Sequence, residues 1–538
     1  MGAGPRVARP SASPFRSRTH RTACSGGPAV NIASIIPITR LRRWTDRALD
    51  LALRPEGVLI ALAVLTRWPL RGRWLYHWDS VNFALALDHF DVARGQPHIP
   101  GYPLYVGLGR ISRWIFGDAQ TALVALSVAG TALAAVLIYR LGAEWVGSGA
   151  GKWAALFWLS SPLVWFYGEI ALPHALDAGF VLLVVWLAWR CARGERMHRP
   201  LALALAVSSG LRPQNLLFLG PIFLWGLSGQ RWRARGEALL WLGGFIMLWL
   251  IPLLALSGGV ERYLEISRAF NAHFWTSTLV FGPGGLSALQ RNAGKLVAYT
   301  AYGVAGAGLV LIRGLRALPA VLQRLSERWP AALGWGLWVT PSLSFYTFIH
   351  MGQQGLVLVF LPALILLAAW AAATGGSWGR WLGAAGVLLN VGIFLLAPEY
   401  PMGLDGIRLL NLSALRNHDA ALAGRFALLH AQFPPERTLV VASQWRFFDF
   451  YAPEYRVLPF GLEDPAERPR AEQIFTHEAS GGAEAIVLFE PELTRWVRPG
   501  SRPWRWWAHN GVRLPGWEWG PGDRWIYGPE GFGLFGEP

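Results

Sequence analysis

The chain has 538 residues, of which 53% are hydrophobic and only 15% are charged. Soluble domains carry about 25% charged residues, so this composition excludes an ordinary soluble protein. The net charge of +16 would suit a nucleic-acid partner, but the arginines form separate clusters, each at the end of an apolar run. Such clusters are typical of the cytoplasmic loops of membrane proteins. We therefore expect membrane lipids, and no nucleic acid, as partners.

Long apolar runs recur along most of the chain, and crossing the hydrocarbon core takes about 20 such residues. The runs cover residues 51–70, 121–139, 153–167, 170–189, 201–227, 238–256, 296–312, 331–349, 356–373 and 381–397. The run 201–227 lies between two basic clusters, so it must cross twice. We expect its turn at Arg212-Pro213, because proline disfavours helix at the residue before it. The pattern predicts an all-α polytopic membrane protein with about eleven transmembrane helices.

The basic clusters also predict the orientation of these helices. They lie in the N-terminal arm and at residues 190–199, 231–235 and 313–328, which the positive-inside rule assigns to the cytoplasm. The N-terminus is then cytoplasmic, whereas the loop 72–105 and the C-terminus are extracytoplasmic. We expect a multi-pass protein of the plasma (inner) membrane. The two cysteines, Cys24 and Cys191, both fall on the cytoplasmic side, so no disulfide is implied.

The chain divides into three expected parts. Residues 1–48 form a basic cytoplasmic arm, residues 49–397 the membrane domain, and residues 398–538 an extracytoplasmic domain. The last part contains a helical pattern at 420–430 and β-like runs at 439–442, 456–460 and 485–489. These predict a small α/β domain of normal size. Its tryptophan-rich end could bind sugar rings or lie at the membrane interface, but we favour packing within a small core for Trp504, Trp506, Trp507, Trp517, Trp519 and Trp525.

The most informative stretch is the external loop from Trp78 to Tyr105, WDSVNFALALDHFDVARGQPHIPGYPLY. Charge near hydrocarbon is costly, so its acidic and histidine residues indicate a functional site. Asp79 begins a predicted interfacial helix with one apolar face, and it could serve as the N-cap of that helix, a role worth about 1 kcal/mol. Prolines and a glycine at 97–103 predict a stiff turn that presents His98 and Tyr102 in fixed positions.

This loop resembles a known pattern. An Asp-Ser pair after the first membrane helix, then a short helix and His98-x-Pro-Gly-Tyr102-Pro, is similar to the first external loop of glycosyltransferase-C-type enzymes. These include the protein O-mannosyltransferase-like and aminoarabinose-transferase-like families. The family usually has proline where this chain has Ile99. The resemblance is clear over about the first 200 residues, and it implies a GT-C-like helix bundle.

The activity that the resemblance implies is an inverting transfer of a sugar at the outer face of the membrane. The donor would be a polyprenyl-phosphate-linked sugar, and the acceptor a lipid, glycan or protein. Asp79 falls on the family's essential acid and would be the general base, and Glu169 falls on its second acidic position. Some members of the family bridge these two positions with a divalent cation (Mg or Mn), so the resemblance allows one between Asp79 and Glu169, but two carboxylates do not establish a site. No other cofactor is expected.

Further candidates for substrate binding lie in other external turns. His174 and Asp177 share one helix face and could form a hydrogen-bonded pair or a helix–helix polar contact. Arg212 is the first candidate for binding the lipid phosphate, and Arg262, with Arg268 and His273, is a weaker one. The segment His350-x-x-Gln353-Gln-Gly resembles the lipid-facing external loop of the family.

Two other classes of protein remain open. A transporter or flippase for lipid-linked glycans would also place polar residues within helices, but it would often show inverted repeats. No internal repeat is evident, and the polar residues concentrate at one face of the membrane. A non-catalytic membrane scaffold would account for the helices, but not for the external acids.

Overall fold

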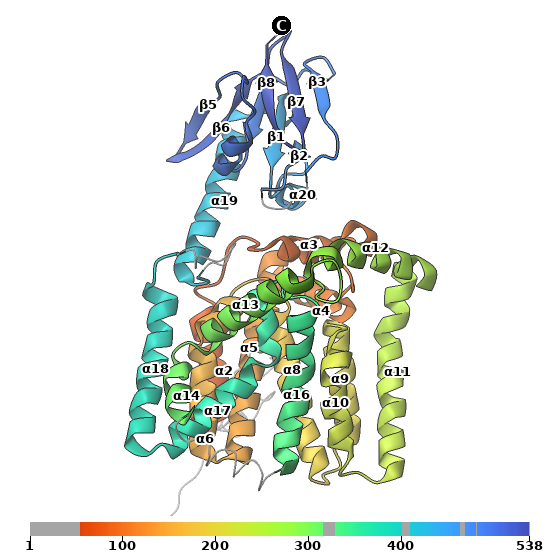
Figure 1. Ribbon diagram of the computed structural model, residues 1–538, viewed down its shortest axis with the longest axis vertical. Helices are drawn as coiled ribbons and strands as arrows, with labels where there is room; N and C mark the ends of the chain where they lie inside the picture. The colour runs from red at the N-terminus through yellow and green to blue at the C-terminus, as the bar shows by residue number, and fades with distance from the viewer. Residues whose placement is uncertain (1–53, 316–328, 401–408, 463–467, 480, 537–538) are drawn as a thin grey trace, which may run out of the picture. The chain divides into compact units, whose positions relative to one another are not determined.

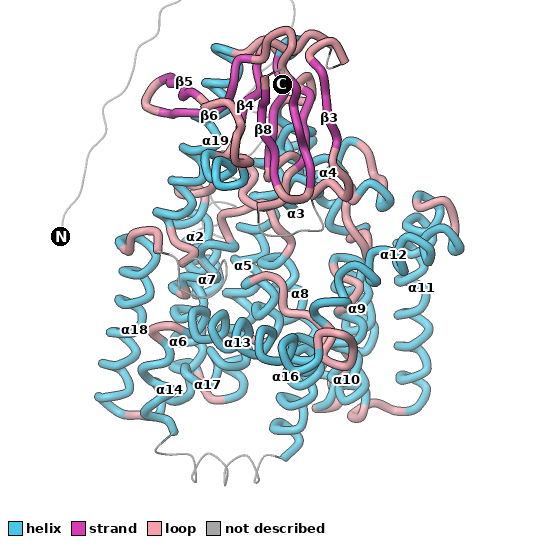
Figure 2. Tube along the Cα trace, turned by 45° about the horizontal axis from the view of Figure 1, so that its top comes forward, coloured by secondary structure: helices cyan, strands magenta, loops and turns pink. Residues whose placement is uncertain are grey.

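The computed structural model describes residues 54–315, 329–400, 409–462, 468–479 and 481–536, without the side chains of 273–276, 313–315 and 329–331. The basic arm 1–48 with Cys24, and nearly all of the basic cluster 313–328, lie outside the described residues. Cys191 is buried and free. Helices make up the part of the chain up to Leu396, and strands occur in the C-terminal part (Figures 1 and 2).

A bundle of helices forms the membrane part (Figure 1). Its helices are α2 Pro55–Arg67, α5 Ala119–Trp145, α6 Ser148–Ser160, α7 Pro162–Tyr167, α8 His174–Ala192, α9 His198–Leu211, α10 Asn215–Leu227, α11 Trp232–Leu256, α13 Gly285–Val304, α14 Ala307–Leu315, α16 Trp329–Phe348, α17 Leu361–Thr374 and α18 Gly376–Leu396. Among the described helices, α5, α8, α11 and α18 are long and apolar enough to cross a membrane, and α10 and α17 are shorter apolar helices. The predicted membrane bundle is confirmed, whereas the number of crossings stays a prediction.

The apolar runs break where local chemistry requires it. The run 201–227 divides into α9 and α10 around Arg212-Pro213, as expected. The run 296–312, expected to be one helix, is two, because the backbone turns at Ala305 with a φ of +34°. The next residue, Gly306, lies against the backbone of Gly386 in α18, and a Cβ atom there would meet the Gly386 oxygen. Close packing of α14 on α18 therefore accounts for the break.

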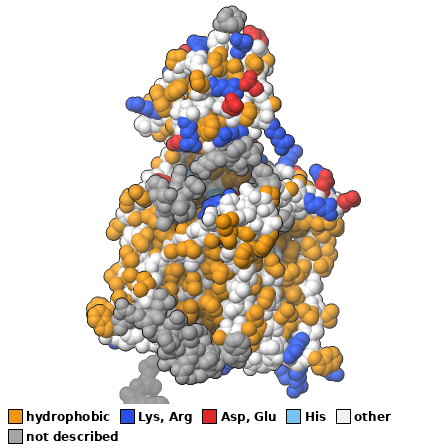
Figure 3. Space-filling view, viewed as in Figure 1, with side chains coloured by type: hydrophobic (Ala, Val, Ile, Leu, Met, Phe, Trp, Pro, Cys, Tyr) orange, Lys and Arg blue, Asp and Glu red, His pale blue; other side chains and the backbone are white. Residues whose placement is uncertain are grey.

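The outer surface of the bundle is apolar. Hydrophobic side chains cover much of the bundle face, and charged side chains gather toward its ends and on the C-terminal domain (Figure 3). Helix α11 is the clearest case, since Leu240 and Leu248 are 80% and 73% exposed. Such exposure would be costly in water but suits lipid chains as the surrounding solvent.

Shorter elements lie at the end of the bundle where α8 begins and α9 ends (Figure 1). They are α3 Trp78–Asp88, the 3-10 helix η2 Val92–Arg94, α4 Pro103–Phe116, α12 Val260–Thr278 and the 3-10 helix η3 Gln354–Val359. Helix α3 is buried on more than the one apolar face that we expected, and its position at the membrane interface stays a prediction. Seven of its eleven residues are buried, polar Ser80 and Asn82 among them. The reason is that α20 of the C-terminal domain packs on α3.

The C-terminal domain is α/β, as predicted. Its helices are α19 Leu412–Gln432 and α20 Arg446–Tyr451, with 3-10 turns η4 Pro435–Arg437 and η6 Pro491–Trp496. A five-stranded sheet has the order β2 Arg456–Pro459, β1 Thr438–Ala442, β4 Ala485–Leu488, β6 Val512–Glu518 and β5 Arg505–His509. A three-stranded sheet contains β3 Gln473–Thr476, β7 Arg524–Gly528 and β8 Gly531–Phe535.

Strand β1 pairs in parallel with both β2 and β4, and the remaining pairs are antiparallel. The tryptophan-rich end mostly packs in a core, as we favoured. Trp517, Trp519 and Trp525 are buried together between the sheets, whereas Trp504 and Trp506 are exposed.

Candidate active site

Asp79 does not cap its helix. The N-cap of α3 is His77, whose Nδ1 atom accepts the backbone N–H of Asp79 at 3.1 Å. The interpretation of Asp79 as a cap is therefore wrong, because an imidazole occupies that position. The carboxylate of Asp79 lies in the first turn of α3, where the helix dipole favours a negative charge, and its oxygens are left for other contacts.

Two imidazoles and an amide surround this carboxylate. His98 Nδ1 lies 3.4 Å from Oδ1, His77 Nδ1 lies 3.6 Å from Oδ2, and Gln353 Nε2 donates a hydrogen bond to Oδ2. Burial alone would favour the neutral acid, but His98, His77 and the Gln353 hydrogen bond outweigh it, so the pKa of Asp79 lies below its ordinary value. With its side chain 19% exposed, Asp79 is an ionised and accessible carboxylate.

The proline-rich turn places His98 beside Asp79, a contact that the sequence did not predict. The peptide bonds before Pro97 and Pro100 are cis, and Gly101 has a φ of +99°. A Cβ atom at Gly101 would lie 2.6 Å from the Leu253 side chain, so only glycine fits. The ring of Tyr102, the N-cap residue of α4, lies 5.1 Å from the ring of His98. Burial raises the pKa of the Tyr102 hydroxyl, so this group is neutral.

Gln353 connects Asp79 to His174. Its Oε1 atom lies 3.0 Å from Nε2 of His174, while its amide nitrogen donates to Asp79. The segment after α16 can approach α8 this closely because residue 355 is glycine. A Cβ atom at Gly355 would lie 2.6 Å from the His174 ring and 2.5 Å from the Tyr167 ring. The structure thus brings together Asp79, His98, His174 and Gln353, which lie far apart in the sequence.

Asp177 and Arg212 form a second cluster, whose side chains are more deeply buried than that of Asp79. Arg212 Nη1 lies 3.3 Å from Asp177 Oδ2, and Asn215 Nδ2 donates to Asp177 Oδ1. Of the two alternatives for His174 and Asp177, the hydrogen-bonded pair is absent, since His174 bonds Gln353 instead, whereas Asp177 makes polar contacts with residues at the ends of the neighbouring helices. Arg212 and Asn215 flank the turn between α9 and α10, which directs both side chains toward α8. Arg212 thus already has an anionic partner in Asp177, and its role as a phosphate ligand stays a prediction.

Sequence reasoning missed two cations of α13. Burial lowers the pKa of His350 to about 4, and the charges of Lys295, Arg291 and Arg212 add to this shift. His350 is therefore neutral at pH 7, and these three cations lie near enough to act on it. One signal was available in the sequence, because the chain contains only two lysines, Lys152 and Lys295, and one of them falls at this external end.

Glu169 does not join the Asp79 group in the structure. Its side chain is buried, and its carboxylate accepts a hydrogen bond from Trp165 Nε1 at 2.8 Å. The guanidinium of Arg67 stacks on the same tryptophan, 4.7 Å from the ring centroid. Burial raises the pKa of Glu169 well above its ordinary value, and the Arg67 charge opposes this only in part. Glu169 therefore contacts a different set of residues from Asp79, and these contacts do not support an ion that bridges the two carboxylates.

The remaining expected ligands lie elsewhere. Arg262 in α12 is exposed and pairs with Glu265 at 2.7 Å. Arg268 is exposed as well, and the side chain of His273 lies outside the described residues. Among the residues that the structure describes, no group of three or more His, Cys, Asp or Glu side chains could hold a metal ion. A divalent cation at Asp79 thus stays a prediction.

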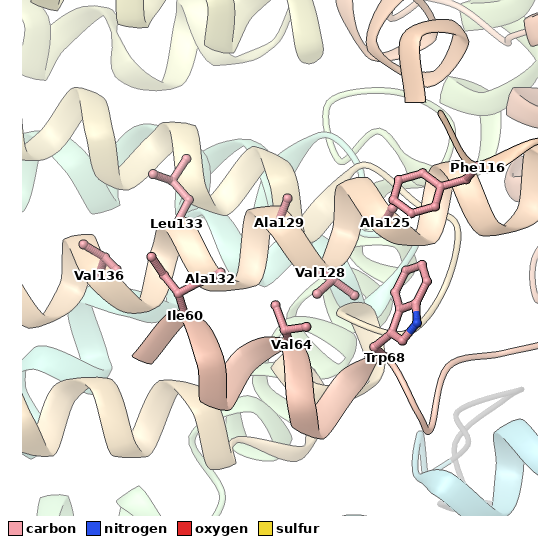
Figure 4. A pocket seen from close by; sticks show the side chains of 10 residues that line it. All are labelled: Ile60, Val64, Trp68, Phe116, Ala125, Val128, Ala129, Ala132, Leu133 and Val136. Atoms are coloured by element: carbon pink, nitrogen blue, oxygen red, sulfur yellow. The ribbon is translucent and has the colours of Figure 1, made fainter. Parts of the chain in front are cut away.

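An apolar groove of about 650 Å³ lies between α2 and α5 (Figure 4). Its lining is Ile60, Val64, Trp68, Phe116, Ala125, Val128, Ala129, Ala132, Leu133 and Val136. None of these side chains carries a charge, so the groove can hold a hydrocarbon chain but not a phosphate. It contains none of the residues around Asp79.

The fold, together with the group of polar side chains around Asp79, indicates a class of protein. The bundle with its C-terminal sheet domain has the fold of the GT-C-like membrane glycosyltransferase superfamily. It matches the structure of ArnT from Cupriavidus metallidurans bound to undecaprenyl phosphate, with a TM-score of 0.52 and 12% sequence identity, over 85% of this chain and 97% of that chain. No protein-family model matches the chain.

Curated relatives lead to the same superfamily. The chain is 24% identical over 412 residues to the undecaprenyl phosphate-alpha-4-amino-4-deoxy-L-arabinose arabinosyl transferase of Pectobacterium atrosepticum, which covers 60% of this chain and 70% of the relative. It is 26% identical over 272 residues to the transferase of the same name from Pectobacterium carotovorum. That match covers 41% of this chain and 46% of the relative, so the chain spans about half the length of that protein.

Proposed function

We propose that this chain is an integral-membrane inverting glycosyltransferase that moves a sugar from a polyprenyl-phosphate-linked donor to an acceptor at the outer face of the plasma (inner) membrane. The observation that carries the proposal is Asp79, an ionised and accessible carboxylate held among two imidazoles and an amide. The curated relatives are named for an undecaprenyl-phosphate-linked sugar, which supports a donor of this class. The acceptor is a lipid, glycan or protein hydroxyl.

The step at Asp79 is a general-base reaction. The acceptor hydroxyl attacks the anomeric carbon of the donor, its proton passes to an Asp79 oxygen, and the bond to the phosphate breaks with its electron pair on the phosphate. Gln353 holds Oδ2, so Oδ1, on the His98 side, is the oxygen that can receive the proton. A positioned general base contributes about 10²–10⁴-fold to a rate.

The departing phosphate needs positive charge, and the cations around His350 supply it. Arg212 is already neutralised by Asp177, so Lys295 of α13 is the first candidate, with Arg291 beside it. Fixed cations at a developing phosphate charge lower the barrier without reorganising. The lipid tail would lie against the apolar outer surface of the bundle, with the N-terminus of the chain cytoplasmic and the C-terminal domain extracytoplasmic.

The lysine pair offers a matched experiment. The full chain in lipid nanodiscs would be assayed for transfer from undecaprenyl-phosphate sugars, with the variants Lys295→Ala and Lys152→Ala. We expect Lys295→Ala to raise the donor KM at least tenfold, and Lys152→Ala, at the α6 end near the expected cytoplasmic face, to leave it unchanged. Transfer by the wild type from none of these donors would overturn the proposal. Movement of the donor between leaflets of a liposome without transfer would indicate a flippase instead.

A further inference from the structure

The segment that carries the catalytic carboxylate is held by the C-terminal domain. We call residues 72–82 the Asp79 segment; it includes His77, Asp79 and the first turn of α3. From α19, the carboxylate of Asp419 accepts two backbone N–H groups of this segment, Arg73 at 2.7 Å and Trp74 at 3.1 Å. Asp419 is itself buried. One carboxylate thus fixes two consecutive peptide groups just before His77.

Helix α20 holds the same segment at two further points. The hydroxyl of Tyr451 accepts the N–H of Leu75, a fully buried residue, at 2.9 Å. After Asp79, the buried side chain of Arg446 donates from Nε to Asn82 Oδ1 at 2.9 Å and from Nη2 to the carbonyl oxygen of Arg94 at 2.5 Å. Hydrogen bonds from the C-terminal domain therefore flank Asp79 on both sides.

Aromatic contacts fill the space between these hydrogen bonds. Trp445 meets Trp78, the residue before Asp79, edge to face with ring centroids 5.0 Å apart. Trp74 stacks on Phe426 of α19 at 5.6 Å. Edge-to-face and stacked pairs prefer defined geometries and so restrict the orientation of the two partners.

The position of these groups in the domain follows from its topology. Strand β1 lies between β2 and β4, both parallel to it, so the strand order reverses at β1 and β4. Open α/β sheets bind ligands outside the carboxyl ends of strands at such a point. Trp445 and Arg446 follow β1 there, and Glu490, after β4, fixes their loop by accepting the N–H groups of Ser443 and Gln444 at 2.8 and 2.9 Å.

We propose that the C-terminal domain is a positioning element for the transferase site, and that Asp419, Tyr451 and Arg446 are its positioning residues. The end of the sheet where many α/β domains bind a ligand binds the chain's own Asp79 segment instead. Helix α3 has 11 residues, and isolated helices shorter than about 12–15 residues are marginal. Its first turn, and with it the direction of the Asp79 carboxylate, therefore depends on the partner that packs on it. The effect on transfer rests on the proposed function, whereas the effect on the segment does not.

A pair of tyrosines tests this inference. Tyr451→Phe removes the acceptor of the Leu75 N–H, and Arg446→Gln removes the bonds on the other side of Asp79. Tyr455→Phe is the matched control, because that hydroxyl donates within the domain, to the carbonyl oxygens of Phe433 at 2.7 Å and Leu429 at 3.3 Å. Hydrogen–deuterium exchange of the full chain in nanodiscs, read at residues 72–82 and at β1 and β4, would be combined with transfer kinetics.

We expect the amides of the Asp79 segment to exchange at least tenfold faster in Tyr451→Phe and Arg446→Gln, with β1 and β4 unchanged and no change in Tyr455→Phe. The kcat of transfer should fall at least tenfold, with the donor KM within twofold. Unchanged exchange at 72–82, faster exchange of the whole domain, or unchanged kcat with a loosened segment would each overturn the inference. A wild type without transfer activity would overturn the proposed function, and the exchange data would still decide whether the domain holds the segment.

Discussion

Asp79 and Glu169 are two external acids in similar positions along the sequence, each following an apolar run, yet they have opposite surroundings. Asp79 is partly exposed and faces two imidazoles and an amide donor, which hold its pKa below the ordinary value. Glu169 is fully buried beside Trp165 and Arg67, and burial raises its pKa. One carboxylate is kept ionised within reach of a substrate, and the other is enclosed.

The difference shows what separates the carboxylate proposed to react from a structural one in this chain. The sequence analysis placed both acids at the external end of the bundle, where a charge close to the hydrocarbon costs free energy. Only Asp79 combines access with neighbours that favour the anion. The backbone of Glu169 adds a structural role, because its carbonyl oxygen accepts the N–H of Gly72 at 3.0 Å, at the start of the Asp79 segment.

The largest expected effect comes from Asp79→Asn. Asparagine preserves the size of the side chain but cannot accept the proton, so transfer should fall about 10²–10⁴-fold, while thermal unfolding in detergent stays unchanged. Asp88→Asn, at the other end of α3, is the control, because Asp88 pairs with Arg113 on the surface. Full activity of the Asp79→Asn variant in the transfer assay would remove Asp79 from the chemistry.

Glu169→Ala should give the reverse pattern. Alanine removes the carboxyl oxygen that accepts the Trp165 N–H at 2.8 Å and leaves this buried donor without a partner. Such an unpaired group costs about 1–3 kcal/mol, so the unfolding temperature should fall, while the transfer rate of the folded protein stays within tenfold of the wild type. If the rate collapses and the unfolding temperature does not change, Glu169 takes part in the reaction, and the comparison between the two acids fails.

The sequence predicted the parts of the fold that depend on local composition. Apolar length and arginine clusters predicted the bundle, and the prolines and glycine at 97–103 predicted a stiff turn that carries His98 and Tyr102. Contacts between segments that lie far apart in the sequence could not be predicted. Gln353 lies 274 residues after Asp79, and no periodicity predicts which helix ends meet. Likewise, the sequence of α3 predicted one apolar face, because its own residues cannot indicate that α20 packs on its polar side.

A change in pH dependence tests the surroundings of Asp79. A lowered pKa means that the carboxylate stays ionised until the pH falls below the ordinary range for aspartate, about 3.9, so its acid limb in kcat/KM lies below that value. His98 is the neighbour that lowers this pKa most, while burial acts in the opposite direction. In His98→Ala the limb should therefore move to higher pH. A limb at the same pH in both proteins would show that His98 does not hold Asp79 ionised.

The smallest effect is expected from Arg262→Ala, and it tests whether access alone makes a site. The side chain of Arg262 is exposed, but it pairs with Glu265, three residues away on the same surface of α12. Exposed ion pairs of this kind contribute little to stability. Among the described residues, none of the groups around Asp79 contacts Arg262. The donor KM of Arg262→Ala should therefore stay within twofold of the wild type, in contrast to the tenfold rise expected for Lys295→Ala. An equal rise in both variants would show that the phosphate site extends over α12, and that exposed cations at this end of the bundle bind the donor without a buried partner.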